Sequence, residues 1–328
     1  MSDSILAVES LTMGFDSKDG FVEIVRDVSF SVRPGEILGI VGESGSGKSL
    51  SAYSIMGLID PPGRISAGKI WVGETNLLDL DEESMRELRG TRIAMIFQDP
   101  MMTLNPVLRI DTQMIEAVQS HFNITRRDAI ARSAAALERV GISDPYSRLR
   151  SYPHELSGGM RQRIAIAIAV LNSADVIIAD EPTTALDVTI QSQILYEVQR
   201  LCAERGTSAV WISHDLGVVS SLADRVCVMY AGQIVEQGPT EDVIASPRHP
   251  YTAGLLASTP GRGTPKKPLS QIRGSMPTPG SIPSGCAFRE RCDFAQERCL
   301  DAPELRGATG EDRFVRCHFP FGENGASK

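Results

Sequence analysis

The sequence predicts an α/β protein in which helices cover a mostly parallel sheet, with an antiparallel portion near the N-terminus. Two observations carry this prediction. A short apolar strand at residues 36–41 is followed by a glycine-rich loop and a helical stretch at 49–58. Further along the chain, apolar runs at 176–180 and 208–214 alternate with segments whose apolar spacing is typical of helices. Strands that alternate with helices in this way favour a parallel sheet.

The other elements follow from local patterns. Residues 5–32 alternate apolar and polar side chains in short runs, broken by a turn sequence at 16–20, as strands joined by turns do. Helices are expected between 110 and 140, where Ala, Glu and Arg are frequent. Short apolar stretches predict further strands at 69–72, 91–98, 225–230 and 233–236. The last two flank Ala231 and Gly232 as the strands of a hairpin would.

A change of composition marks a domain boundary. The 328 residues have room for about two domains. Residues 261–285 contain five Pro, five Gly and four Ser, which is typical of a linker or an irregular packing segment. We therefore expect a main domain over residues 1–255 and a small C-terminal region over residues 256–328.

Charge and hydropathy argue against several classes of protein. A net charge of −8 disfavours a nucleic-acid binder, because phosphate contacts require a basic face. The longest apolar run, residues 164–171, is far shorter than the roughly 18 residues of a membrane span. The N-terminus lacks the basic and apolar segments of a signal peptide. We expect a cytoplasmic protein that reaches a membrane only through partners.

Residues 42–49 carry the most specific motif. Their sequence, Gly-Glu-Ser-Gly-Ser-Gly-Lys-Ser, fits a phosphate-binding loop between a strand and a helix. Glycines let backbone N–H groups curl around an anion, and the helix N-terminus adds partial positive charge. Lys48 can then reach the β- and γ-phosphates of a nucleotide while the Ser49 hydroxyl binds Mg²⁺. The alternative is a Gly/Ser-rich turn that happens to precede Lys48.

Two acidic residues follow the buried strand at 176–180. Asp180 closes the strand, where its carboxylate can hold Mg²⁺, and Glu181 comes next, where it can polarise an attacking water. Many strands end in Asp at a turn, so the strand alone is a weak signal. The sequence Glu-Pro-Thr-Thr-Ala-Leu-Asp at 181–187 favours the roles in Mg²⁺ binding and water activation over an ordinary turn.

A second anion site is indicated upstream, at Leu-Ser-Gly-Gly-Met in residues 156–160. Ser157 can cap a helix that begins at Gly158 and Gly159 and exposes its N–H groups. The simpler interpretation is an ordinary capped helix. Ser157 lies only 23 residues before Asp180, in a chain that already carries a phosphate-binding loop, and this favours a functional role.

With these motifs in this order, residues 5–250 resemble an ATP-binding cassette (ABC) ATPase. The resemblance implies ATP and Mg²⁺ as cofactors, with residues 42–49 as the Walker A loop. It implies Glu181 as the catalytic glutamate, His214 as the switch histidine, and Gln98 as a sensor of Mg²⁺ and the γ-phosphate. The implied Mg²⁺ ligands are Ser49, Gln98 and Asp180. The implied nucleotide contacts are Phe15, Gly42, Ser44, Gly45, Ser46, Gly47, Lys48, Ser49, Ser157, Gly158, Gly159 and Asp187.

Three of these positions have simpler interpretations. Phe15 falls where the family has an aromatic that stacks on adenine, but an aromatic near a strand end is more often packing, and Phe21 is a possible substitute. A single His after a strand is more often structural than catalytic. A polar loop residue such as Gln98 is common, and a catalytic role for it is indicated only because the sequence Phe-Gln-Asp-Pro at 97–100 follows a strand. One departure from the family is Met160, where the signature motif has Gln.

The C-terminal part narrows the resemblance to the ATPase subunits of dipeptide/oligopeptide importers. This narrower resemblance rests on four features: His-Pro-Tyr-Thr at 249–252, the Pro-rich segment, a group of four cysteines, and Met-Met-Thr-Leu-Asn-Pro at 101–106. The similarity then extends over nearly the whole chain. Such subunits work with a second cassette, identical or homologous, two transmembrane permease subunits and an extracytoplasmic solute-binding protein. They lie at the cytoplasmic face of the membrane.

The four cysteines are Cys286, Cys292, Cys299 and Cys317. Zinc sites usually contain a tight C-x2–4-C pair, and this set has none, so loosely spaced thiolates suit an iron–sulfur cluster better. The resemblance points the same way, to a 4Fe–4S cluster. The alternatives are unliganded thiols, or zinc with His318 as a ligand. Cys202 and Cys227 stand alone in apolar surroundings, as core residues do.

Other interpretations of the whole chain remain open. Peptides are the transported solute by resemblance, and nickel, glutathione-like compounds or sugars are alternatives. A non-transport ABC ATPase is disfavoured, because only 109 positions separate Lys48 from Ser157 and no long coiled coil fits between them. A nucleotide-binding regulator without hydrolysis is disfavoured by Glu181 and His214. An exporter is disfavoured because exporters often carry fused membrane helices.

Overall fold

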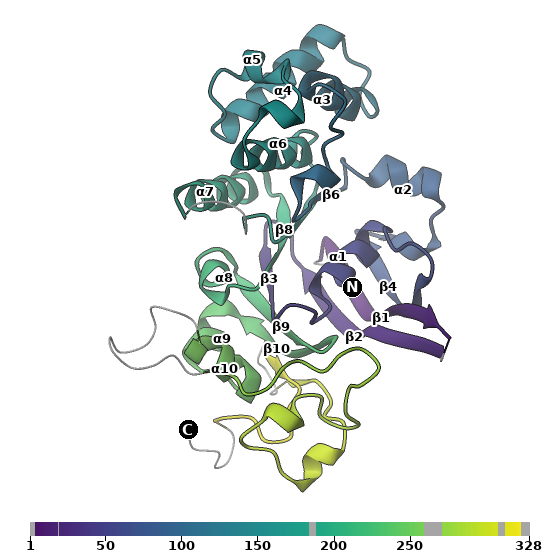
Figure 1. The fold of residues 1–328 in the computed structure, drawn as a ribbon, viewed down its shortest axis with the longest axis vertical. Coiled ribbons are helices and arrows are strands. Elements are labelled where there is room, and N and C mark those ends of the chain that lie inside the picture. Colours follow the sequence, from purple (N-terminus) through teal and green to yellow (C-terminus); the bar gives the residue numbers. More distant parts are fainter. Residues whose placement is uncertain (1–3, 19, 184–187, 259–270, 308–311, 323–328) are drawn as a thin grey trace. The chain divides into compact units, whose positions relative to one another are not determined.

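Contacts between residues divide the chain into two units, each assembled from segments that are distant in sequence (Figure 1). Unit 1 comprises Met1–Leu6, Val32–Glu36 and Trp71–Val210. Unit 2 comprises Ala7–Ser31, Ile37–Ile70 and Trp211–Lys328. The computed structural model describes residues 4–18, 20–183, 188–258, 271–307 and 312–322.

The described strands of unit 2 belong to two sheets. In one, β1 (Leu6–Ser17) lies between β2 (Gly20–Val32) and β4 (Gly63–Val72). In the other, β3 (Ile37–Val41) pairs in parallel with β9 (Arg225–Tyr230), which pairs antiparallel with β10 (Gln233–Pro239). Every residue of β3 and β9 is buried, as expected for strands covered on both faces.

Four described helices accompany these strands in unit 2. They are α1 (Lys48–Met56), α8 (Leu216–Leu222), α9 (Thr240–Ala245) and α10 (Pro250–Ser258). α8 packs against β3, and α9 packs against β9 and β10. α8 begins after Asp215, whose carboxylate accepts a hydrogen bond from the Gly217 N–H at 2.7 Å. Such a cap satisfies a backbone donor that a helix leaves open at its first turn.

The C-terminal segment adds strands to the sheet of β9 and β10. β12 (Phe314–Val315) pairs antiparallel with β10 and with β11 (Arg306–Gly307). Next to this pairing, Arg313 forms a buried ion pair with Glu236 at 2.6 Å. The Glu236 carboxylate also accepts hydrogen bonds from the backbone N–H groups of Arg248 and His249, so the buried charge is compensated on several sides. The predicted domain division at residue 255 stays a prediction, and both sides of it lie in unit 2.

In unit 1, β6 (Ile93–Ile96) pairs in parallel with β7 (Val176–Asp180), and β7 is followed in the sheet by β8 (Ser208–Ser213), whose second half lies in unit 2. Four helices gather beyond β6 in Figure 1 and pack on one another: α3 (Ile110–Gln119), α4 (Arg126–Arg139), α5 (Pro145–Leu149) and α6 (Gly158–Val170). The other elements of unit 1 are β5 (Thr75–Asn76), α2 (Glu82–Leu88), α7 (Val188–Arg205) and the 3-10 turns Leu77–Asp79, Pro100–Met102 and Pro153–Glu155. The 3-10 turns of unit 2 are Arg289–Arg291 and Glu297–Leu300.

Most predicted elements are confirmed. The hairpin of β9 and β10 turns at Ala231 and Gly232, which have φ values of 45° and 81°. The strand expected at 69–72 is the second half of β4, whose first half is mostly exposed and therefore lacks an apolar pattern. No helix among the described residues is long and apolar enough to cross a bilayer.

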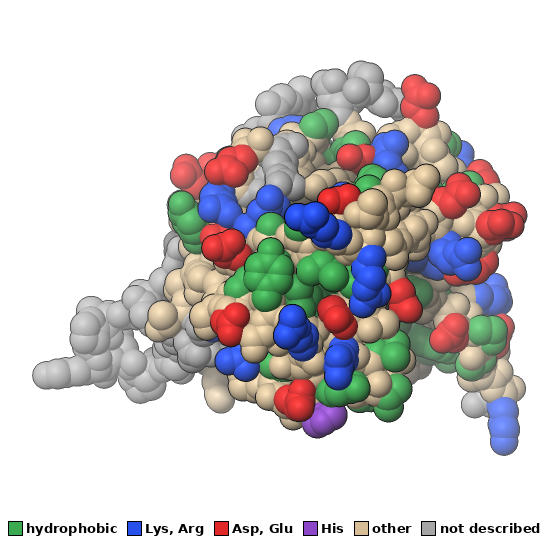
Figure 2. All heavy atoms as spheres, turned by 90° about the horizontal axis from the view of Figure 1, so that it is seen from above, with side chains coloured by type: hydrophobic (Ala, Val, Ile, Leu, Met, Phe, Trp, Pro, Cys, Tyr) green, Lys and Arg blue, Asp and Glu red, His purple; other side chains and the backbone are tan. Residues whose placement is uncertain are grey.

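The face of the molecule drawn in Figure 2 carries basic and acidic side chains interspersed around a small apolar patch. Neither sign of charge covers a broad area of this face. Mixed charge of this kind produces little net field over a surface, and hence little attraction for a polyanion.

Candidate functional site

The predicted phosphate-binding loop forms a tight turn between β3 and α1 in unit 2. Gly45 (φ 81°) and Gly47 (φ 99°) adopt the left-handed backbone conformation that residues with a Cβ avoid. Gly47 is the N-cap of α1, and the first turn of this helix has no acidic residue. The partial positive charge of its N-terminal N–H groups is therefore not offset by a carboxylate within the helix. A loop of this shape can bind a phosphate group.

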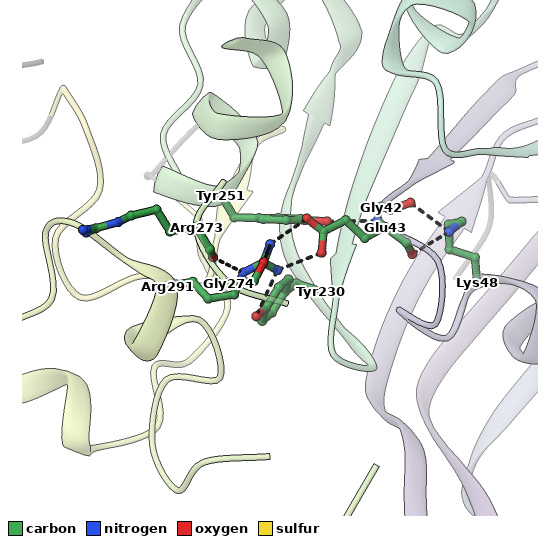
Figure 3. A network of polar contacts seen from close by, with 8 residues as sticks. All are labelled: Gly42, Glu43, Lys48, Tyr230, Tyr251, Arg273, Gly274 and Arg291. Atoms are coloured by element: carbon green, nitrogen blue, oxygen red, sulfur yellow. Dashed lines mark hydrogen bonds and ion pairs between the residues drawn. The ribbon is translucent and has the colours of Figure 1, made fainter. Parts of the chain in front are cut away.

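Lys48 lies against the loop that precedes it. Its Nζ donates hydrogen bonds to the carbonyl oxygens of Gly42 and Glu43, both at 2.9 Å (Figure 3), and the side chain is buried. The carbonyl oxygen of Ser46 accepts a hydrogen bond from the Gly232 N–H at 2.9 Å. The turn between β9 and β10 thus supports the loop. Ser44 and Gly45 are exposed at its tip, and Ser49 is half-buried.

Gln98 and Glu181 come together at one edge of unit 1. β6 and β7 pair in parallel with Ile96 opposite Ala179, so the residues after both strands meet at the same edge. The Gln98 Nε2 donates to a Glu181 carboxylate oxygen at 3.4 Å. Glu181 has a φ of 44°, a strained conformation for a residue with a side chain. Asp180 is the last residue of β7 and is almost fully buried.

The residues predicted to bind Mg²⁺ come from both units. Ser49 is the second residue of α1 in unit 2, whereas Gln98 and Asp180 belong to unit 1. Hydroxyl, amide and carboxylate oxygens are the kinds of ligand that Mg²⁺ prefers. The donor set fits the ion, and its assembly around Mg²⁺ stays a prediction. Asp187, which the resemblance assigns to the nucleotide, lies outside the described residues.

The signature segment begins a helix, as predicted. Ser157 is the N-cap of α6, and its Oγ accepts a hydrogen bond from the Met160 N–H at 3.3 Å. Ser157 and Gly158 are exposed, and outside the neighbouring residues and the backbone of α6 no atom of the described residues comes within 4 Å of a Cβ placed on Gly158. This helix N-terminus is therefore open to a ligand or a partner.

His214 follows β8 and is exposed in unit 2. It lines a hollow of about 450 Å³ together with Val41, the last residue of β3, and Leu255 of α10. The residue that precedes the phosphate-binding loop and the predicted switch histidine thus border the same hollow.

Phe15 and Phe21 have different surroundings. The Arg64 guanidinium lies 4.2 Å from the centre of the Phe21 ring, so this face of the ring is already covered. Phe15 is half-buried, and its ring lies beside Gly63, where a Cβ would approach Phe15 Cε1 to 2.8 Å. Part of the Phe15 ring therefore packs against Gly63, and the contact of this ring with adenine stays a prediction.

The four C-terminal cysteines line one cavity. Cys286, Cys292, Cys299 and Cys317 border it with His249, His318 and Phe288. Burial raises the pKa of the Cys286 and Cys292 thiols and raises the pKa of Cys317 to about 12, and neighbouring thiols act in the same direction. Burial also lowers the pKa of His249 to about 3, which keeps its imidazole neutral. Within the described part of the chain, no three or more His, Cys, Asp or Glu side chains converge closely enough to hold a single metal ion.

Sequence reasoning missed a polar network at the phosphate-binding loop. Glu43, inside the loop, contacts Tyr251 and Arg291, and Arg291 also contacts Tyr230. The only signals were the position of Arg291 beside Cys292 and the place of Tyr251 in the His-Pro-Tyr-Thr sequence. Neither indicates a partner that lies more than 200 residues away.

Comparisons with known proteins agree with this geometry. A family model described as "ABC transporter" matches residues 25–184, and one described as "Oligopeptide/dipeptide transporter, C-terminal region" matches residues 235–299. The dipeptide transport ATP-binding protein DppD of Haemophilus influenzae is 45% identical over 98% of this chain and 97% of its own length.

Solved structures show a similar fold. A dimeric ATP-binding cassette in a post-hydrolysis state, bound to ADP and phosphate, has a TM-score of 0.66 at 24% identity and covers 72% of this chain and 98% of its own. The cbiO1 protein of Clostridium perfringens, part of the ABC transporter complex cbiONQ, has a TM-score of 0.62 at 27% identity, covering 74% of this chain and 92% of its own.

Proposed function

The chain belongs to the ATP-binding proteins of the ABC transporter family, and on that premise we propose that it hydrolyses ATP to power the import of peptides across a membrane. The observation that carries the proposal is the similarity to a dipeptide transport ATP-binding protein along nearly the whole chain, C-terminal region included. The turn at 42–49, with Lys48 beside it, supplies the phosphate-binding loop that such an activity requires.

The loop binds the triphosphate in this proposal. Lys48 moves its Nζ from the Gly42 and Glu43 carbonyl oxygens to the β- and γ-phosphates, and the N–H groups of residues 44–49 surround the phosphate oxygens. Phe15 lies against the adenine. Ser49, Gln98 and Asp180 would hold Mg²⁺, which would neutralise charge on the phosphates.

Glu181 prepares the attacking water. Its carboxylate accepts a hydrogen bond from a water in line with the γ-phosphate, while Gln98, which donates to the same carboxylate, keeps the carboxylate oriented. His214 donates a hydrogen bond toward the γ-phosphate. Ser157, Gly158, Gly159 and Asp187 act at the nucleotide of a second cassette, because the signature helix is exposed at its N-terminus.

The proposed partners are a second ATPase subunit, identical or homologous, two transmembrane permease subunits, and an extracytoplasmic solute-binding protein that acts through the assembled complex. In that assembly the chain lies at the cytoplasmic face of the membrane. Apolar side chains after Gln98 are suited to an apolar partner, since Met102 is 65% exposed and Val107 is 75% exposed. Peptides are the proposed solute, with nickel, glutathione-like compounds and sugars as alternatives.

For the C-terminal cysteines we propose a 4Fe–4S cluster with a structural role. Four thiols that border one cavity fit this cofactor in number and kind. Each thiolate binds a different iron of such a cluster, so the four sulfurs need not converge on one point as they do around zinc. The iron ions of such a cluster would stabilise the thiolate form and so oppose the burial that raises the thiol pKa values.

The proposal is tested with the assembled complex in proteoliposomes. Lys48→Ala should abolish ATP binding and import, and Glu181→Gln should keep ATP binding while ATP turnover and peptide import fall by about a thousandfold or more. The control is Lys18→Ala, at an exposed position in the turn after β1, which should match the parent protein.

The substrates tested are labelled dipeptides, Ni²⁺, glutathione and a sugar. Import of Ni²⁺ or a sugar, with no peptide import, would replace the proposed solute and leave the ATPase standing. Unchanged ATP hydrolysis in the Glu181→Gln complex would remove the catalytic assignment itself.

A further inference from the structure

Glu43, the second residue of the phosphate-binding loop, is held at three of its groups within unit 2 (Figure 3). Its backbone N–H donates to the Tyr251 hydroxyl at 2.9 Å, and its carbonyl oxygen accepts from Lys48 Nζ at 2.9 Å. Its carboxylate forms a two-pronged ion pair with Arg291, with distances of 2.7 and 3.0 Å. Two of these three partners come from beyond residue 250.

Arg291 is itself held in place by the C-terminal segment. Its side chain is 7% exposed. Its Nε donates to the Arg273 carbonyl oxygen at 2.8 Å, and its Nη2 donates to the Gly274 carbonyl oxygen at 3.4 Å. With the two bonds to Glu43 and one to the Tyr230 hydroxyl at 3.5 Å, each guanidinium nitrogen has a partner. A fully engaged, buried guanidinium is a fixed point rather than a mobile surface charge.

Aromatic packing joins the same segment to the strand beneath the loop. The Phe288 ring lies 5.2 Å from the Tyr230 ring and 5.4 Å from the Tyr251 ring, centre to centre. Tyr230 is the last residue of β9, which pairs directly with β3. Phe288 and Arg291 both stand between Cys286 and Cys292. The cysteine-bearing loop therefore carries two side chains into contact with the support of the phosphate-binding loop.

We propose that Arg291 is a positioning residue of the ATP site: held by the C-terminal segment, it fixes Glu43 and so keeps the phosphate-binding loop in the shape that receives a triphosphate. The inference rests on the proposed function of residues 42–49. Loss of the ion pair frees the Glu43 carboxylate and lets the backbone of residues 43–44 rotate. The backbone N–H groups that should converge on the phosphates then sample other directions. Ordering them when ATP binds costs conformational entropy, and this cost weakens ATP binding.

The test measures the ATP Kd, KM and kcat of the full chain in its assembled complex. Arg291→Met should raise the Kd and KM for ATP by about tenfold, within the usual range of coupling between neighbouring sites, with kcat at saturating ATP nearly unchanged. Arg291→Lys keeps the charge but cannot form the two-pronged contact, so its Kd should fall between those of Arg291→Met and the parent. Glu43→Gln should raise the Kd as Arg291→Met does.

A double-mutant cycle separates positioning from general damage. If Arg291 acts through Glu43, then Arg291→Met in the Glu43→Gln background should raise the Kd no further. The control is Arg306→Met in the same segment, because the ion pair of Arg306 with Glu304 is exposed. It should bind ATP like the parent.

The outcomes distinguish this inference from the proposed function. A parental Kd in all Arg291 and Glu43 variants, together with loss of ATP binding in Lys48→Ala, overturns the positioning role alone. Fully additive effects of the two substitutions also overturn it. Parental ATP binding by Lys48→Ala refutes the phosphate-binding loop itself, and the inference falls with it. If Arg291→Met fails to fold, Arg291→Lys and Glu43→Gln give the same comparison.

Discussion

Two glycines of the phosphate-binding loop are required for different physical reasons. A Cβ on Gly42 would lie 2.3 Å from the Met229 carbonyl oxygen and 2.8 Å from Ser46 Oγ, so the loop could not keep its place against β9. Among the described residues other than its two chain neighbours, no atom comes within 4 Å of a Cβ on Gly45, whose φ is 81°. Gly42 is therefore limited by space and Gly45 by backbone conformation.

This difference predicts unequal costs for two matched substitutions. Gly42→Ala should lower the free energy of unfolding by about 3 kcal/mol, as forced backbone shifts in packed regions do, and Gly45→Ala by about 1 kcal/mol from the left-handed conformation alone. Chemical denaturation of the purified chain measures both values. Equal losses for the two variants would contradict the packing argument.

Single residues differed in how far the sequence could predict them. Lys48 and Gly47 were predictable because a local motif with a defined spacing places them at a helix start. The contact between Gln98 and Glu181 was predictable from the rule that parallel strands end at the same edge. The ion pair of Glu43 with Arg291 was not, because 248 positions separate the two residues and no periodic pattern connects them.

At the scale of elements, apolar periodicity accounts for what was predicted. β3, β7 and β9 are wholly buried, and they appear in the sequence as apolar runs interrupted only by Asp180 at the end of β7 and Arg225 at the start of β9. β11 and β12 have two residues each, which is too short for any period. β12 forms because β10 offers it a pairing edge, and β11 forms by pairing with β12. The C-terminal segment is therefore held by long-range contacts, and a small segment with few buried apolar residues gains from a cofactor that joins its loops.

The cysteine-bearing loops supply the prediction at this scale. Protein prepared without oxygen should contain iron and sulfide and absorb broadly near ~400 nm, as thiolate-bound clusters do. Replacing Cys286, Cys292, Cys299 or Cys317 with Ser should remove this signal. Cys202→Ser and Cys227→Ser should keep it, since Cys202 is buried in unit 1, Cys227 is buried in unit 2, and neither lines the cavity. Cluster-free protein should show faster proteolysis of the C-terminal segment. Stoichiometric zinc without iron would contradict the iron–sulfur cluster, but it would still support the claim that a metal stabilises the C-terminal segment.

At the scale of the whole molecule, the proposed nucleotide residues are divided between the two units. Residues 42–49 and His214 belong to unit 2, whereas Gln98, Ser157, Asp180 and Glu181 belong to unit 1. The sequence could predict the members of each group from local motifs, but not this division, because it depends on contacts among segments far apart in the chain. The sequence contains one phosphate-binding loop and one signature segment.

The single signature segment predicts a dependence between subunits that can be measured directly. Consider complexes with two differently tagged copies of this chain. If Ser157 acts on the partner's nucleotide, Lys48→Ala in one copy and Ser157→Ala in the other damage the same site, so about half of the ATPase activity should remain. Placing both substitutions in one copy damages both sites and should leave almost none.

A control is needed because Ser157→Ala also removes a helix cap, at a cost of about 1 kcal/mol. Thr125→Ala removes the equivalent cap of α4, where Thr125 Oγ1 accepts from the Asp128 N–H at 3.2 Å. Used in place of Ser157→Ala, it should leave both arrangements at the activity of the complex that carries Lys48→Ala alone, about half of the parent activity. The opposite ranking, with more activity when both substitutions share one copy, would show that Ser157 serves the ATP bound to its own chain. In that case a monomer could complete its own site, and the requirement for a second cassette would lose its basis.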